Sequence, residues 1–109
     1  MTTEGQYKIR EEYKKDFPRL PEKKQDIILY RMAIRQDEQG RQSHLVPIAK
    51  VTDDPTYKQL IDLGYLTYEV FGEGDKAIAN LIVTLKGERY LTTWLDEIHE
   101  LEWNSRQQF

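Results

Sequence analysis

The stretch between Tyr57 and Leu91 constrains the fold most, because helical and strand patterns follow one another there with little connecting chain. Residues 57–63 carry an apolar stripe at helical spacing, and this stripe stops at Gly64. Glycine takes the left-handed backbone of a helix C′ position without strain, so we predict a positive φ at Gly64. Residues 65–70 are mostly aromatic or β-branched, as strand residues are. We therefore predict a helix that turns directly into a strand.

A reversal of the chain follows this strand. Two glycines lie within residues 72–76, and residues 78–84 then alternate in polarity as a second strand does. The two strands are predicted to pair as a hairpin. Thr84 is placed to accept hydrogen bonds from the first amides of a following helix. That helix is predicted to present one apolar face made by Tyr90, Leu91, Trp94, Leu95, Ile98 and Leu101.

The segments "DLGYL" and "IVTLKGERYL", with the hairpin between them, resemble the recognition-helix end, the wing and the closing helix of winged helix-turn-helix proteins. The similarity covers roughly residues 46 to 95. With the flanking segments it implies an α+β fold, a winged helix-turn-helix with an extra N-terminal helix and a long C-terminal helix. It also implies a small DNA-binding or transcription-regulatory protein of the kind that bacteria, phages and plasmids carry.

An amphipathic helix is predicted at the N-terminus, over residues 4–17. Its apolar positions recur every four residues, at Ile9, Tyr13 and Phe17. This helix either covers the body of its own chain or exchanges with a second protomer. We assign residues 1–20 to an N-terminal helical extension, residues 21–103 to the winged-helix domain and residues 104–109 to a frayed tail.

The segment between the extension and the constraining stretch is predicted to hold two helices and a short strand. The first core helix runs from Glu22 to about Asp37. A short strand over residues 41–46 and a brief helix over residues 47–51 follow. Next, Asp53 or Asp54 is predicted to cap the helix that starts at Pro55.

Length and composition fit one domain without covalent cross-links. At 109 residues the chain can bury its own core. It has no cysteine, which excludes disulfides and thiolate metal sites and is compatible with a reducing compartment. No apolar run approaches membrane length, and the N-terminus is polar with mixed charge. We therefore expect a cytoplasmic protein with no membrane segment.

Basic residues are concentrated in the N-terminal half. Residues 1–50 hold 11 Lys and Arg against 8 Asp and Glu, whereas residues 51–109 hold 5 against 11. Asp53 and Asp54 front the helix expected to enter a DNA groove, so weak base reading and a shift of phosphate contacts toward the N-terminal half are expected. Substitutions there should therefore weaken binding more than loss of Lys58. The candidate contacts to double-stranded DNA are Lys14, Lys15, Lys24, Arg35, Arg41, Thr56, Lys58, Gln59 and Lys76.

The tip of the hairpin favours a different partner. Glu73 and Asp75 lie on either side of the tip and only Lys76 is basic, whereas wings that enter a minor groove tend to present Arg or Lys. The alternative is a winged helix that serves as a protein-interaction module and does not bind DNA. In that case its acidic half would dock a basic partner or mimic the charge of DNA.

The closing helix carries more apolar surface than a terminal helix needs. Large aromatic side chains are favoured interface anchors, and the apolar positions are spaced in a heptad-like way. This surface either completes the core or forms a homodimer. The candidate dimer-interface residues are Leu91, Trp94, Ile98, Leu101 and Trp103.

The sequence carries no motif for enzymatic chemistry. It has no cysteine nucleophile, no Walker loop and no dinucleotide-binding fingerprint. His44 and His99 are isolated, and the acidic neighbours of His99 are typical of a solvated helix surface. We therefore expect no catalytic residue, no metal site, no cofactor and no small-molecule substrate.

Overall fold

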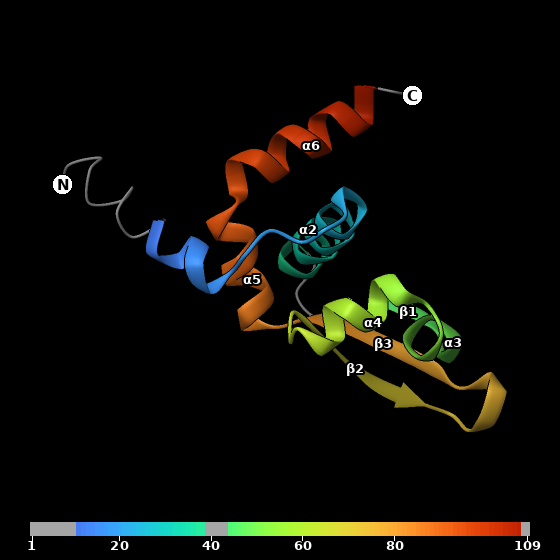
Figure 1. The fold of residues 1–109 in the computed structure, drawn as a ribbon. Helices are drawn as coiled ribbons and strands as arrows, with labels where there is room; N and C mark the ends of the chain where they lie inside the picture. The colour runs from blue at the N-terminus through green and yellow to red at the C-terminus, as the bar shows by residue number, and fades with distance from the viewer. Residues whose placement is uncertain (1–10, 39–43, 108–109) are drawn as a thin grey trace.

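The computed structural model describes residues 11–38 and 44–107 and has a mixed α+β architecture (Figure 1). Residues 11–16 are helical. In Figure 1 the tip of the hairpin lies at the lower right and the last helix lies at the top. The other elements, in chain order, are α2 (Lys23–Glu38), β1 (His44–Pro47), α3 (Ile48–Thr52), α4 (Pro55–Asp62), β2 (Leu66–Phe71), the 3-10 helix η1 (Gly74–Lys76), β3 (Ile78–Val83), α5 (Leu85–Thr93) and α6 (Leu95–Gln107).

The three strands form one antiparallel sheet with β3 in the middle, in the order β1-β3-β2. His44 of β1 lies opposite Leu81 of β3, and Leu66 of β2 lies opposite Val83. Ala79, Leu81 and Val83 are buried, because β3 packs against α2, α3 and α5. The alternation predicted for residues 78–84 is therefore confirmed as one buried and one more exposed side of a strand.

α2 is the helix around which the core is built. It contacts β3, α5 and α6, and its Leu29 is fully buried. Tyr90 from α5 and Ile98 from α6 are also fully buried and belong to the same cluster. The first core helix was predicted over nearly the same residues, from Glu22 to about Asp37, and is confirmed as α2.

The segment that precedes α2 is part of this core. Phe17 and Leu20 are buried. The Trp94 Nε1 group donates a hydrogen bond of 2.6 Å to the Phe17 carbonyl oxygen, and the Leu20 amide donates one of 3.0 Å to Tyr90 Oη. The predicted boundary at residue 20 therefore does not separate an extension from the domain. Phe17 and Leu20 are held by their own chain, whereas Ile9 lies outside the described residues.

Three predicted helix ends are confirmed. Asp54, rather than Asp53, is the N-cap of α4. Gly64 has φ 82° immediately after α4, which is the left-handed conformation that glycine adopts without strain. Thr84 caps α5 by accepting a hydrogen bond from the Gly87 amide at 3.0 Å. Its hydroxyl also donates to the Gly64 carbonyl oxygen at 2.5 Å, so the same residue joins α5 to the end of α4.

The long C-terminal helix is a correction to the prediction, because the chain bends at Trp94 and forms two helices, α5 and α6. Trp94 has φ −111° and ψ 24°, outside the helical region. Thr92 and Thr93 each donate a side-chain hydrogen bond to the carbonyl oxygen four residues earlier, to Glu88 and Arg89. Such bonds favour a bend in a helix, and the bond from Trp94 to Phe17 then holds the bent geometry.

The C-terminal tail also differs from the prediction. α6 continues to Gln107, so residues 104–107 are helical where fraying was expected. Ion pairs stabilise this last part of the helix, because Glu102 lies 2.8 Å from Arg106 Nε and 3.0 Å from Arg31 Nε. Residues 108–109 lie outside the described chain.

Candidate functional site

α4 begins with a cap that engages one of its two leading carboxylates. Asp54 Oδ1 accepts a hydrogen bond from the Thr56 amide at 3.0 Å. Its other oxygen lies 3.5 Å from Lys50 Nζ. Asp53 is exposed. The repulsion of phosphate that was expected from this pair is therefore partly offset, because Asp54 has both a helix-end donor and a cation beside it.

The three residues predicted to contact DNA from α4 lie in different surroundings. Lys58 is exposed. Gln59 Oε1 accepts a hydrogen bond of 2.6 Å from Gln25 Nε2, which ties α4 to the start of α2. Thr56 is only 9% exposed and lies one helical turn before the fully buried Leu60. Thr56 is therefore a core residue, and Lys58 is the freest of the three for an external partner.

The predicted basic residues near the N-terminus do not lie near α4. Lys14 Nζ is 3.3 Å from Glu11 and 5.1 Å from the centre of the Trp94 ring. Lys15 is exposed in the same helical segment. Figure 1 places this helix beside α5, at the opposite end of the view from the hairpin tip that carries Lys76. One DNA surface therefore does not include all the predicted lysines.

Two more predicted basic residues belong to α2. Lys24 Nζ lies 3.3 Å from Glu22, and both side chains are exposed. Arg35 is exposed near the other end of α2 and lines a cavity described below. Arg41 lies outside the described residues.

Two lysines that the sequence reasoning missed lie at the two ends of α4. Lys50 lies beside Asp54, and its ammonium is 5.9 Å from the centre of the Tyr57 ring. The Lys86 stem lies over the end of α4, with its Cδ in van der Waals reach of a Cβ at Gly64. Neither position could be found by spacing along α4, because Lys50 belongs to α3 and Lys86 belongs to α5. We call Lys50, Lys58 and Lys86 the α4 lysines.

The hairpin presents apolar side chains as well as its acidic tip. Lys76 is exposed in η1, between Asp75 and the buried Ala77. Phe71 is 54% exposed and its cross-strand neighbour Ile78 is 42% exposed. Exposed apolar side chains that adjoin one another favour contact with protein.

Most of the predicted dimer interface is buried within the chain's own core. Leu91 and Ile98 are buried, and Trp94 is partly buried with its indole bonded to Phe17. Leu101 is half-buried and Trp103 is 64% exposed. Of the five candidates, these last two are the ones that remain open to a second copy.

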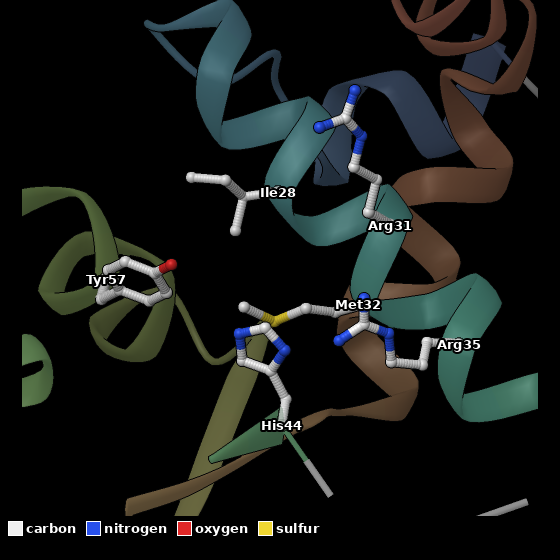
Figure 2. Close-up of a pocket in the computed structure, with 6 residues that line it drawn as sticks. All are labelled: Ile28, Arg31, Met32, Arg35, His44 and Tyr57. Atoms are coloured by element: carbon white, nitrogen blue, oxygen red, sulfur yellow. The ribbon is translucent and has the colours of Figure 1, made fainter. Parts of the chain in front are cut away.

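A cavity of about 160 Å³ lies between α2, β1 and α4 (Figure 2). α2 contributes four side chains to it, and β1 and α4 contribute one each. Figure 2 shows the Arg35 guanidinium beside the His44 ring and the Tyr57 hydroxyl turned toward α2. The lining residues are Ile28, Arg31, Met32, Arg35, His44 and Tyr57. We call this the α2-β1-α4 cavity.

His44 has an altered titration in this cavity. Burial lowers the pKa of His44 below its ordinary value, and the positive charge of Arg35 lowers that pKa further. The imidazole is therefore held toward its neutral form, which can both donate and accept a hydrogen bond.

Comparisons with protein-family models, with curated proteins and with solved structures found no match. Within residues 11–38 and 44–107, no three His, Cys, Asp or Glu side chains gather as a metal site requires. None of the helices in that part of the chain has the length and apolar character needed to span a bilayer.

Proposed function

We propose that the chain is a winged helix-turn-helix protein that binds double-stranded DNA mainly through its phosphates. Two facts support this. The order α2, β1, α3, α4 and the β2-β3 hairpin is the order that the sequence resemblance implies. The α4 lysines lie before, on and after the helix that would approach the DNA, and this is the observation that carries the proposal.

The surroundings of α4 favour phosphate contacts over base contacts. Lysine ammonium groups are strong phosphate partners that carry little sequence information. Base edges are read by side chains at the exposed N-terminal part of the helix. In α4 that part holds Pro55, the buried Thr56 and the Asp54 cap, so it offers few base-reading groups. Binding is therefore expected to be weak in sequence discrimination and sensitive to salt.

A fluorescence anisotropy titration with a mixed-sequence duplex tests this proposal. At about 50 mM salt, the wild-type chain should bind, and Lys58→Ala combined with Lys86→Ala should weaken binding on the order of tenfold. Lys14→Ala combined with Lys15→Ala is the matched control, because it removes the same charge from the N-terminal helix, which does not lie near α4 (Figure 1). Absence of binding by the wild type, or equal losses in both double variants, would reject the proposal.

A second candidate function is a protein-interaction module, and the exposed Phe71 and Ile78 on the hairpin favour it. Together with the acidic Glu69, Glu73 and Asp75, this hairpin would fit a partner that is apolar and basic. Poly-lysine is a simple basic probe for it. This alternative predicts that poly-lysine shifts the hairpin amide NMR signals while duplex DNA shifts none. Shifts confined to α4 on addition of DNA would exclude it.

A further inference from the structure

We propose that the α2-β1-α4 cavity binds a small organic anion, with the charged end at Arg35 and His44 and an apolar body against Ile28 and Met32. The proposal concerns a ligand site and does not rest on DNA binding. It differs from the sequence-based expectation, which included no small-molecule ligand.

The apolar part of the proposed ligand follows from the side chains that form the walls of the cavity and from its volume. Ile28 and Met32 come from successive turns of α2 and line one wall, and the Tyr57 ring lines the other (Figure 2). A cavity of about 150 Å³ with apolar walls accommodates benzene. At about 160 Å³ this cavity has the size for a single six-membered ring or a branched alkyl group.

The charge of the proposed ligand follows from the cavity's rim. Among the residues that the structure describes, no acidic side chain lines the cavity. Among the side chains that the structure describes, Arg35 has no ion-pair partner, whereas Arg31 donates to Glu102 and points away from His44 in Figure 2. An uncompensated guanidinium beside an imidazole favours an anion, and a carboxylate accepts hydrogen bonds from both.

The Tyr57 hydroxyl and the titration of His44 add to this geometry. The hydroxyl, which is turned toward α2, can donate a further hydrogen bond to the anion. Of the charged side chains that the structure describes in the cavity, Arg35 lies beside His44 and Arg31 points away from it, and the cross-strand neighbour Leu81 is apolar. An anion placed between Arg35 and His44 would oppose the effect of Arg35, so the pKa of His44 should rise on binding and affinity should increase as the pH falls.

Benzoate is the probe that matches these features, and NMR of the chain without DNA is the measurement. We expect benzoate to shift the Met32 methyl, Tyr57 ring and His44 signals, with a Kd on the order of 1 mM for so few atoms. The histidine titration should move to higher pH in saturating benzoate. Arg35→Gln should weaken binding about tenfold or more, whereas Arg89→Gln, an exposed arginine of α5, should leave it unchanged.

Two other probes separate the two halves of the proposal. Benzamide has the same ring without the charge, and inorganic phosphate has charge without the ring. The proposal requires both to bind more weakly than benzoate. Equal binding by either probe, equal losses in Arg35→Gln and Arg89→Gln, or no shift at Met32 and His44 in millimolar benzoate would overturn it. These outcomes are independent of the DNA titration, because no DNA is present.

Discussion

Tyr90 and Asp26, 64 positions apart in the chain, share a hydrogen bond of 2.6 Å in the core. The Tyr90 hydroxyl donates to Asp26 and accepts from the Leu20 amide at 3.0 Å, while Arg19 lies 2.6 Å from the other Asp26 oxygen. Burial, followed by the hydrogen bond to Asp26, raises the pKa of Tyr90, so the hydroxyl stays protonated and donates. This contact joins α5 to α2 and to the segment that precedes α2.

Tyr90→Phe should therefore destabilise the fold by about 2–3 kcal/mol. The change removes one hydrogen bond to a buried carboxylate and leaves the Leu20 amide without its acceptor. Urea unfolding followed by circular dichroism measures the change. Tyr68→Phe, at a partly exposed tyrosine of β2, is the control and should alter the free energy of unfolding by less than about 0.5 kcal/mol. Equal unfolding midpoints for both variants would contradict the structural role of this contact.

Gly87→Ala should also destabilise the chain, although alanine is the better helix former. A Cβ at this position in α5 would overlap the carbonyl oxygen of Tyr65, which is backbone and has little freedom to move. The expected cost is about 1–3 kcal/mol, larger than the roughly 1 kcal/mol that alanine gains over glycine in a helix. Thermal unfolding measures the balance, and a raised melting temperature would show that α5 is not packed this closely.

Glu102 should stabilise the folded state at neutral pH, and this contribution to the free energy of unfolding should be lost in acid. Burial alone would raise its pKa, but hydrogen bonds and charges from Arg106 and Arg31 outweigh burial and hold the pKa below its ordinary value of 4.5. A lowered pKa in the folded state means that the contribution is present above pH 4.5 and disappears as the pH falls through the folded-state value. Glu102→Gln should cost about 1–2 kcal/mol at neutral pH. In urea titrations that cost should shrink toward pH 3, and a constant difference between wild type and variant across pH would refute the assignment.

We predict that the chain self-associates through α6. The contact should involve Trp103 and Leu101, because the other three candidate interface residues are buried or partly buried in the chain's own core. The wild-type chain should show a light-scattering mass that rises above 13.0 kDa with concentration. Trp103→Ala should prevent this rise without reducing stability, because Trp103 is mostly exposed. A wild-type mass that stays at 13.0 kDa through the micromolar range would contradict the prediction of a dimer.

Local signals in the sequence were sufficient for most element boundaries. Gly64, Thr84 and the Asp54-Pro55 pair act within a few residues of their own positions, so their roles as a C′ glycine and as helix starts could be predicted without knowledge of the fold. The hairpin was predicted for the same reason.

Tertiary contacts account for what could not be predicted. Trp94 fits the apolar stripe of one continuous helix, and the bend there is held by a bond to Phe17, 77 positions away. Asp26 looks like an ordinary surface acid on α2, and its burial depends on Tyr90 and Arg19. The α2-β1-α4 cavity takes residues from three elements, so no spacing along the chain indicates it.

The salt dependence of DNA binding tests the central proposal most directly. For the wild-type chain, log affinity for a mixed-sequence duplex should fall linearly with log salt. Lys58→Ala should reduce that slope by about one, because an exposed lysine of α4 would no longer release a counterion from a phosphate. The slope of the Lys15→Ala control should equal that of the wild type. If Lys15→Ala reduces the slope and Lys58→Ala does not, then α4 is not the helix that meets the DNA.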